Sequence, residues 1–408
     1  MKNVPFKRFL VNRNGGMWGS EPGSDEFDVL CIRVADFDYE NLKTKASAST
    51  VRSITEKQLQ KNQLHDGDIL LEKSGSGEKT PVGRAVYYSG NDDAICSNFI
   101  ERLTVNQQTL NPKFACYILS AAYSQRKNLD CIKQTTGIQN LSVDDYLSSV
   151  TIPLFDIETQ KRITKWLDKQ LSKVAQVITA KQAQLQKLST YRQSLITRAV
   201  TKGLDPNVEM KDSGYDIANN IPIHWVTIKL QYLCKLATGN QDTQDAVPDG
   251  QYPFYVRSPT IERTNLVTYS GTGILIAGDG VGAGKVFHYA EGQYGIHQRV
   301  YLLSEISDLI DPKYLFFYIK TIFSCEVERG TAKSTVPSIR MPMLTRFLVC
   351  VPPKREQIEI RDYCQKVEEK TEAISEDIKN NIRLLKEYRS SLISAAVTGQ
   401  LAIDEAEE

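Results

Sequence analysis

The stretch that decides the fold is YRQSLITRAVTKGL at residues 191–204, because it recurs as YRSSLISAAVTGQL at residues 388–401. Nine of the fourteen positions are identical, and the two copies are separated by 197 residues. This period is too long for a solenoid, whose repeats have about 20–50 residues. The repeat therefore predicts a tandem duplication of a whole globule plus a helix.

Weaker matches continue upstream of both copies in the same order. Gln160 and Gln357 are separated by the same 197 residues. The segment Asn-Pro-Lys-Phe at 111–114 matches Asp-Pro-Lys-Tyr at 311–314. In each half, an apolar run is followed by a glycine-rich turn. These matches indicate that the duplication includes the globules as well as the helices.

Two long helices are the clearest secondary structure. Residues 156–200 contain neither glycine nor proline, and a second helical run follows Pro352-Pro353. In both runs apolar residues recur at spacings of three and four, which is typical of a coiled coil. Each run predicts a helix of about 45 residues, or about 65 Å, whereas globular helices average about 11–12 residues. We therefore expect the two helices to pair; the alternative is two ordinary core helices.

Connectivity predicts the direction of this pair. The first helix ends near Gly203 and leads into the second globule, and the second helix begins near Lys354, where that globule ends. A paired coil must therefore be antiparallel. Residues 169–204 hold seven Lys/Arg and no carboxylate, whereas residues 356–377 hold eight carboxylates and three bases. These opposite charges favour association, but they would fit a parallel pair about as well.

The remaining sequence divides into two globules. We expect globules at residues 1–152 and 205–350, and helical regions at 153–204 and 351–408. Short β-like runs together with brief helical segments predict an α+β fold for each globule. The expected architecture is two α+β domains on an antiparallel coiled coil, arranged as a pseudo-two-fold tandem repeat.

Composition excludes several classes of protein. The 408 residues include 50 basic and 49 acidic side chains, so a nucleic-acid ligand would require local clusters of positive charge. The apolar runs are too short to span a bilayer, and no secretory signal is expected, because the first residues contain no apolar stretch. The eight cysteines lack CxxC spacing and are expected to be buried, reduced thiols of a cytoplasmic protein. No metal site is expected.

Motifs for catalysis are not found. An adenine methyltransferase needs Asn/Asp-Pro-Pro-Tyr/Phe, and the neighbours of Pro352-Pro353 do not fit. The nearest approach to a phosphate-binding loop, residues 278–286, has Asp279 in place of the first glycine and Val286 in place of Ser/Thr. This glycine-rich segment predicts either a tight turn between strands or a turn that approaches DNA phosphates through its N–H groups.

Four sequence features together carry a family resemblance. They are Gly-Met-Trp-Gly-Ser-Glu-Pro at 16–22, Ile-Pro-Ile-His-Trp at 221–225, the Ile-Pro and Val-Pro-Pro segments that precede the long helices, and the paired Tyr-Arg-x-Ser-Leu-Ile motifs. Over essentially its whole length, the chain resembles the specificity subunit of a type I restriction–modification enzyme.

The resemblance implies a DNA-reading adaptor without catalytic activity. Two target recognition domains would each read one half of a split, asymmetric site on double-stranded DNA. The two helical regions would dock two methyltransferase subunits, and restriction (motor) subunits would complete the enzyme. S-adenosylmethionine and ATP would bind only to those partner subunits. The alternative from another functional class is a coiled-coil scaffold with paired ligand-binding domains that do not bind DNA.

The candidates for DNA contact are basic, amide and hydroxyl side chains in polar loops. Arg and Lys suit guanine, Asn and Gln suit adenine, and Ser and Thr favour phosphates. The alternative for each loop is an ordinary solvated loop. The candidates are Lys73, Ser74, Lys79, Arg84, Lys133, Thr136, Gln139 and Asn140 in the first globule, and Lys285, Arg329, Lys333, Ser334, Thr335 and Arg340 in the second.

The repeated helix ends supply candidates for subunit docking. Tyr191 and Arg192 recur as Tyr388 and Arg389. A pseudo-two-fold protein that holds two copies of one partner needs similar residues at equivalent positions. The alternative is that these four side chains only cap the coil.

Overall fold

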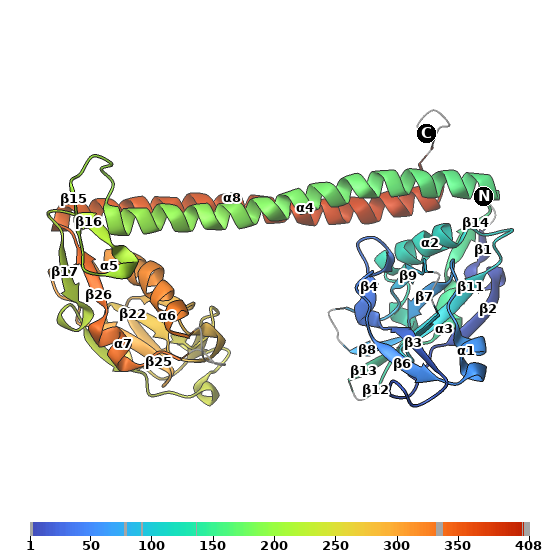
Figure 1. Cartoon of the computed structure of the whole chain (residues 1–408), viewed down its shortest axis with the longest axis horizontal. Helices are drawn as coiled ribbons and strands as arrows, with labels where there is room; N and C mark the ends of the chain where they lie inside the picture. Colours follow the sequence, from blue (N-terminus) through green and yellow to red (C-terminus); the bar gives the residue numbers. More distant parts are fainter. Residues whose placement is uncertain are drawn as a thin grey trace. The chain divides into compact units, whose positions relative to one another are not determined.

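The computed structural model describes residues 3–76, 80–90, 93–135, 137–331, 338–401 and 403 (Figure 1). The chain divides into two compact units. The first consists of Met1–Gln182 with Lys379–Glu408, and the second of Ala183–Ile378. Each unit therefore contains one globule and a part of both long helices, α4 (Ile157–Lys202) and α8 (Lys354–Val397).

The first unit has a mixed α+β fold, as predicted. Its strands are β1 (Asn3–Pro5), β2 (Leu10–Gly15), β3 (Phe27–Ile32), β4 (Phe37–Asp38), β5 (Lys43–Thr44), β6 (Val51–Ile54), β7 (Ile69–Glu72), β8 (Ser74–Ser76), β9 (Ala85–Tyr87), β10 (Ala94–Cys96), β11 (Ile100–Val105), β12 (Ile132–Thr135), β13 (Ile138–Leu141) and β14 (Thr151–Pro153). Its short helices are α1 (Glu56–Asn62), α2 (Pro112–Ser124) and α3 (Val143–Ser149).

The largest sheet of the first unit has the strand order β2-β11-β7-β9-β5-β4. Two three-stranded sheets, β10-β3-β6 and β12-β13-β8, accompany it. Helix α2 lies between the large sheet and the long helices (Figure 1). Its Phe114 and Leu119 share one buried core with Leu71 of the sheet, Leu167 of α4 and Ile393 of α8.

The second unit is also α+β. Its strands are β15 (Met210–Asp212), β16 (Asn220–Pro222), β17 (Val226–Lys229), β18 (Lys235–Thr238), β19 (Tyr252–Tyr255), β20 (Glu262–Thr264), β21 (Tyr269–Ser270), β22 (Gly273–Ala277), β23 (Phe287–Ala290), β24 (Gln293–Ile296), β25 (Val300–Ser304) and β26 (Leu348–Val351). Its short helices are α5 (Pro312–Tyr318), α6 (Ser324–Thr331) and α7 (Met341–Arg346).

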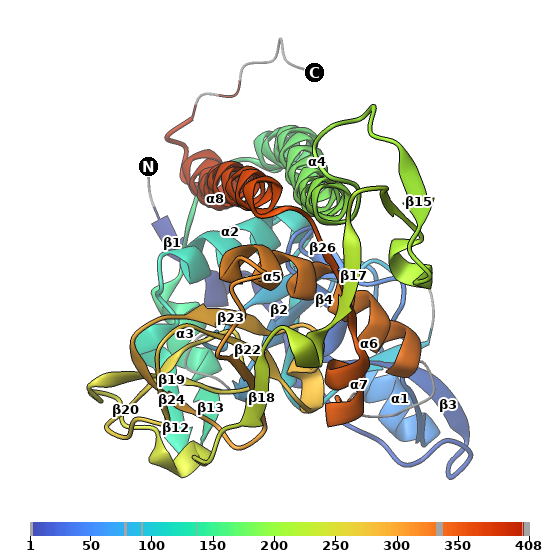
Figure 2. The same cartoon turned by 90° about the vertical axis from the view of Figure 1, so that its left-hand side faces the viewer.

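Helix α5 has the same role in the second unit as α2 in the first. It lies between the long helices and the sheet β18-β25-β22-β23 (Figure 2). The buried Tyr314 donates from its hydroxyl to the Val200 carbonyl of α4 at 3.3 Å and to the Cys350 carbonyl of β26 at 2.8 Å. The globule is thus joined to the helices through its core.

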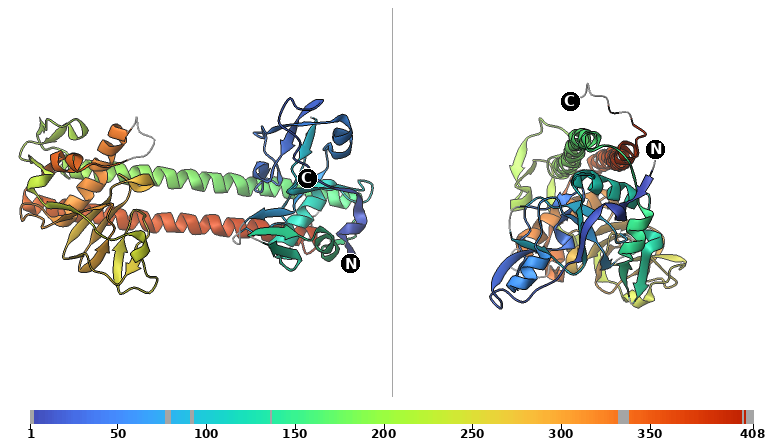
Figure 3. Two further views of the ribbon diagram at one scale, coloured as in Figure 1. Left: turned by 90° about the horizontal axis from the view of Figure 1, so that it is seen from below. Right: turned by 90° about the vertical axis from the view of Figure 1, so that its right-hand side faces the viewer.

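The long helices confirm the predicted antiparallel pair. In each unit they lie side by side (Figure 3). In the first unit, Leu167 near the start of α4 shares a core with Ile393 near the end of α8. In the second, Ile196 near the end of α4 shares a core with Ile360 near the start of α8. Start therefore packs against end in both units, over helices of 46 and 44 residues.

The repeated glutamines form two equivalent clamps. Gln160 accepts from the Asn111 N–H at 2.8 Å and donates to the Thr109 and Phe155 carbonyls at 3.0 and 2.9 Å. Asn111 is the N-cap of α2. Each clamp therefore ties the first turn of a long helix to the first turn of a short one.

The clamp of the second unit repeats these bonds with different residues. Gln357 accepts from the Asp311 N–H at 2.6 Å and donates to the Leu309 and Pro352 carbonyls at 2.9 and 2.8 Å. Asp311 is the N-cap of α5. The two halves of the duplicated sequence therefore also share the hydrogen bonds of this glutamine.

Candidate nucleic-acid interface

Two polar loops of the first globule form one sheet. Strand β8 pairs antiparallel with β13, which places Ser74 opposite Asn140, and β13 pairs with β12, which places Asn140 opposite Lys133. The Ser74 hydroxyl donates to the Asn140 amide oxygen at 2.6 Å, across 66 residues of sequence. Asn140 and Lys133 are exposed. The structure therefore brings three candidates from two loops onto one surface.

Lys73 lies at the start of this surface, but its charge is partly compensated. Its Nζ lies 2.9 Å from a carboxylate oxygen of Glu101, and Nε of Arg13 lies 3.2 Å from the other. Lys133 is exposed, and no carboxylate lies within 4 Å of its ammonium group among the described residues. Lys133 is therefore better placed than Lys73 to meet a phosphate.

Gln139 was predicted to read bases, but the structure buries its side chain. Side chains alternate across strand β13, so Asn140 is exposed while Gln139 is buried. The Gln139 amide oxygen accepts from the Val82 N–H at 3.3 Å. In this structure its amide supports the loop that carries Val82 and does not face solvent.

Arg84 is held in a partly buried ion pair with Glu72. Its Nε lies 3.0 Å from Glu72, and its guanidinium lies over the Tyr39 ring at 3.8 Å. Burial raises the pKa of the Glu72 carboxyl, against the opposing effect of the Arg84 guanidinium. These two contacts hold the Arg84 side chain in one position on the globule.

The candidates Lys79 and Thr136 lie outside the described residues.

In the second globule the glycine-rich segment is a tight turn between β22 and β23. A 3-10 turn covers Gly280–Gly282. A Cβ added at Gly282 would lie 2.2 Å from the Arg257 carbonyl oxygen, so only glycine fits there. The turn expected from the sequence is therefore present. At Gly282 it packs so closely against Arg257 that no side chain fits.

Two arginines that the sequence analysis missed flank this turn. Asp279 accepts from Arg257 at 2.9 Å and from Arg299 at 2.5 Å. Burial alone raises the pKa of Asp279, but the two guanidiniums together hold its pKa below the usual value. Both arginines are exposed, as is Lys285. No local motif marks Arg257 or Arg299, because only the fold brings them together.

One of the remaining candidates of the second globule, Arg340, lies beside the same turn. Ile339 donates its N–H to the Gly278 carbonyl at 2.7 Å, which places the exposed Arg340 beside the glycine-rich segment. The backbone of Arg329 belongs to α6, but its side chain lies outside the described atoms. Lys333, Ser334 and Thr335 also lie outside the described residues.

The two globules share one backbone frame around these surfaces. Gly16 donates its N–H to the Ile100 carbonyl at 2.9 Å, and Gly239 donates to the Val300 carbonyl at 3.1 Å. A Cβ at Gly16 would lie 2.2 Å from the Ser97 oxygen, and one at Gly239 would lie 2.1 Å from the Ile296 oxygen. Both glycines are therefore required for the same close approach of two chain segments.

Side chains of different chemistry occupy equivalent positions on this frame. Trp18 follows Gly16 by two residues, as Gln241 follows Gly239. The Phe99 carbonyl accepts from the Lys73 N–H at 2.9 Å, and the Arg299 carbonyl accepts from the Gly278 N–H, also at 2.9 Å. The first globule thus has aromatic residues where the second has an amide and a guanidinium.

The docking candidates on the helices divide into two kinds. Tyr191 and Tyr388 are 59% and 55% exposed, so the repeated tyrosines present similar surfaces. Arg389 instead donates to the Tyr39 and Glu40 carbonyls at 3.3 and 2.5 Å. Its burial lowers the pKa of the guanidinium. Arg389 therefore anchors α8 to the first globule, and its repeat partner Arg192 is half-buried.

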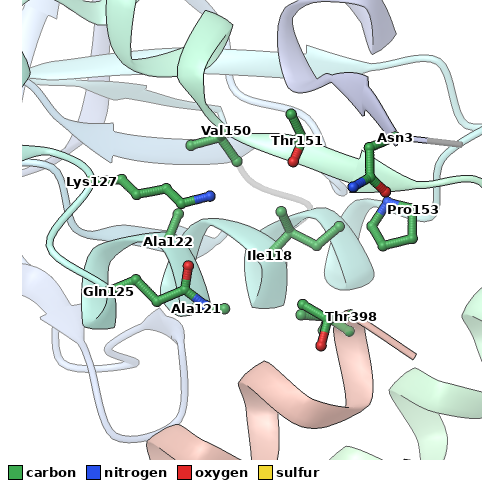
Figure 4. Close-up of a pocket in the computed structure, with 11 residues that line it drawn as sticks. Asn3, Ile118, Ala121, Ala122, Gln125, Lys127, Val150, Thr151, Pro153 and Thr398 are labelled. Carbon is green, nitrogen blue, oxygen red and sulfur yellow. The ribbon is translucent and has the colours of Figure 1, made fainter. Parts of the chain in front are cut away.

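A small cavity adjoins the same end of α8 (Figure 4). Ile118 of α2, Pro153 of β14 and Thr398 line it. Its volume of about 110 Å³ is well below the roughly 300–1,000 Å³ of small-molecule pockets. We therefore interpret it as a packing gap and not as a ligand site.

Groups suited to metal binding or thiol chemistry were sought across the described part of the chain. Within it, no cluster of three or more His, Cys, Asp or Glu side chains could hold a metal ion. No disulfide joins the described cysteines, and burial raises the pKa of Cys116 and Cys364 to about 12. No described helix has the length and apolarity that crossing a membrane requires.

Solved structures share this architecture. One similar chain comes from a structure of the type I R-M system that concerns its complex assembly and conformational transition; its TM-score is 0.71 at 15% identity, over 98% of both chains. Another is the HsdS subunit from Thermoanaerobacter tengcongensis, with a TM-score of 0.51 at 15% identity, over 98% of this chain and 97% of that one. At these identities the likeness concerns the fold alone.

Sequence comparisons name the family. The type I restriction enzyme EcoDI specificity subunit of Escherichia coli is 28% identical over 184 residues, which is 45% of this chain. The match spans only 40% of that relative's length. The model of the type I restriction modification DNA specificity domain matches twice, at residues 32–187 and 222–384. Because these two matches cover most of the sequence, the chain belongs to the family of type I restriction modification DNA specificity domains.

Proposed function

We propose that the chain is the DNA-binding specificity subunit of a type I restriction–modification system. It reads a bipartite, asymmetric target with its two globules and docks methyltransferase and restriction subunits. The observation that carries this proposal is the shared backbone frame with different side chains, the exposed Trp18 and Phe99 in one globule against the buried Gln241 and the exposed Arg299 in the other. Two globules with different surfaces on duplicated helices are what an asymmetric split site requires.

The charges on the two surfaces support this function. Lys133 lies beside the polar Asn140 on one surface, and Lys285 and Arg340 lie near the arginine pair on the other. Such local clusters supply phosphate contacts to a chain whose net charge is only +1. We propose that the subunit itself is non-catalytic and cytoplasmic, with S-adenosylmethionine and ATP bound by its partners.

The decisive experiment is a methylation map of the host genome with and without this chain. A specificity subunit predicts a split methylated motif that disappears when the gene is deleted and returns when it is restored. The deletion strain carrying an empty vector is the control. An unchanged methylation map, together with no binding of the purified complex to DNA, would instead favour a scaffold that does not touch DNA.

Replacing Lys133 with alanine is expected to weaken DNA binding across all sequences. An exposed lysine that meets a phosphate contributes to affinity without reading bases, so the salt dependence should also fall by about one unit of slope. The measurement is the dissociation constant over a salt series. Lys57→Ala, an exposed lysine on α1 of the same globule, is the matched control. Equal slopes for both variants would remove Lys133 from the interface.

Asn140→Ala is expected to relax one base position, since the exposed amide can bond an adenine edge at about 1–3 kcal/mol of discrimination. Gln139→Ala is expected instead to destabilise the first globule by about 1–2 kcal/mol, because the buried Val82 N–H loses its acceptor. Selection of bound sequences from a random pool, alongside thermal unfolding, separates the two effects. A relaxed base in Gln139→Ala without loss of stability would restore Gln139 as a reader.

Native mass spectrometry of the assembled complex should show two methyltransferase subunits for each copy of the chain. Tyr191→Ala and Tyr388→Ala should each reduce occupancy by one copy, because the two exposed tyrosines repeat at equivalent helix positions. Tyr232→Ala, which removes an exposed tyrosine away from the long helices, is the control. A single copy at saturation in the unaltered protein would contradict the two-site proposal.

A further inference from the structure

A larger cavity opens beside the polar sheet of the first globule. Its volume of about 640 Å³ lies within the roughly 300–1,000 Å³ of small-molecule pockets. Ser74 and Gly75 of β8 line it, so it is continuous with the surface that carries Asn140 and Lys133. The proposed DNA interface thus borders a hollow large enough for one small planar ligand.

Two exposed aromatic rings belong to this cavity. Trp18 is 41% exposed and Phe99 is 43% exposed, and both line it. The Arg52 guanidinium lies over the indole at 4.8 Å and holds it in place. Because every nucleobase has a flat π-face, preset aromatic rings of this kind are stacking platforms for bases.

The backbone holds the segments that carry Trp18 and Phe99 together. Met17 donates its N–H to the Cys96 carbonyl at 2.8 Å, which ties the Trp18 segment to the segment that leads to Phe99. The absence of a Cβ at Gly16 permits this approach, since a Cβ would lie 2.2 Å from the Ser97 oxygen. The Gly-Met-Trp-Gly motif is therefore a device that places Trp18 beside the cavity.

The lining also offers donors and acceptors for the edge of a base. The paired Glu72 and Arg84 supply carboxylate oxygens and guanidinium N–H groups. The Arg84 guanidinium lies over the Tyr39 ring. The buried hydroxyl of Tyr39 has no hydrogen-bond partner among the described residues. A buried hydroxyl of this kind is normally satisfied, but water does not reach it here, so the groups open to a ligand are those of Glu72 and Arg84.

The charge of the lining favours an anionic ligand. Three cations, Arg33, Lys45 and Arg84, line the cavity with one carboxylate, Glu72. Arg33 is paired with Asp36 at 3.1 Å. Lys45 donates to the Ala35 carbonyl at 2.8 Å and has no carboxylate partner in the described part of the chain. One positive charge is therefore left over for a phosphate.

We propose that this cavity binds a single nucleotide. The base stacks on Trp18 or Phe99, its edge faces the Glu72–Arg84 pair, and its phosphate meets Lys45. The source is either an unpaired nucleotide of bound DNA or a free nucleoside monophosphate. The first source rests on the proposed DNA binding, and the second does not. The second globule has Gln241 and Arg299 at the equivalent positions, so this site belongs to the first globule alone.

Calorimetric titration of the full chain with each of the four deoxynucleoside 5′-monophosphates tests the site directly. We expect saturable binding of at least one of them. Phe99→Ala and Trp18→Leu should each weaken it about tenfold or more, because a stacking surface is removed. Phe27→Ala is the matched control, since Phe27 is 40% exposed in the same unit and does not line the cavity. Equal weakening by Phe27→Ala would overturn the assignment.

A second titration distinguishes the two sources. It compares a random-sequence duplex that carries one bulged nucleotide with the same duplex fully paired. If DNA supplies the nucleotide, the bulged duplex binds more tightly and competes with the monophosphate, and Phe99→Ala abolishes its advantage. Monophosphate binding without a bulge advantage assigns the site to free nucleotides. No saturable monophosphate binding together with no bulge advantage overturns the proposal. Failure of the paired duplex to bind would count against the proposed function only, because the monophosphate titration does not depend on it.

Discussion

Replacing Gln357 with alanine is expected to lower the free energy of unfolding by about 3–5 kcal/mol. The side chain is fully buried and makes three hydrogen bonds, with the Asp311 N–H and the Leu309 and Pro352 carbonyls. Alanine leaves these three backbone groups unpaired in the interior, at about 1–3 kcal/mol for each that water cannot reach. It also leaves a cavity between α8 and α5.

Urea unfolding of the full chain measures this effect, with Trp225 as the reporter. Trp225 is buried in the second unit, and its indole N–H donates to Glu356 of α8 at 3.1 Å, so its fluorescence follows the region of the clamp. Gln365→Ala, an exposed glutamine on the same helix, should change stability by less than about 0.5 kcal/mol. Similar values for the two variants would mean that the clamp does not hold the unit together.

Exchange of residues 1–152 for the corresponding part of another family member is expected to replace one half of the methylated motif and leave the other half unchanged. The proposed DNA-contacting side chains of the first globule, such as Lys133 and Asn140, lie within the exchanged segment. The second globule has its own core, which includes Trp225 and Tyr314. A new reader in one globule therefore leaves the contacts of the other intact.

The methylated motif of the exchanged enzyme is the measurement. The reciprocal exchange of residues 205–350 is the control and should alter only the opposite half. Because Arg389 donates to the carbonyls of Tyr39 and Glu40, the incoming globule needs a loop that accepts these hydrogen bonds. A motif that changes in both halves after a single exchange would contradict independent reading by the two globules.

The sequence alone predicted the parts of this protein that depend on local or repeated patterns. Spacings of three and four along an uninterrupted run determine a helix, because neighbouring turns bring these positions onto one face. The helices α4 and α8 and their antiparallel pairing followed from that spacing and from connectivity. The 197-residue repeat likewise identified Gln160 and Gln357 as equivalent, although their hydrogen bonds became visible only in the fold.

Residue types in loops indicated chemistry but not exposure. Lys133 and Gln139 stood in one polar loop, and only the pairing of β13 with β12 and β8 shows that Gln139 turns inward. Similarly, Arg389 matched Arg192 in the repeat, yet the Tyr39–Glu40 loop covers it. A strand places alternate side chains on opposite faces, and the sequence did not identify β13 as a strand with one buried face.

The tertiary structure alone decided which distant segments meet. Asp279 joins Arg257 and Arg299, and Gly16 allows Trp18 and Phe99 to line one cavity, through backbone contacts between segments that are remote in sequence. Helical periodicity is a property of neighbouring residues, so a sequence displays it directly. Contacts between strands depend on the register of the whole sheet and on close approaches at a few glycines, which no local pattern encodes.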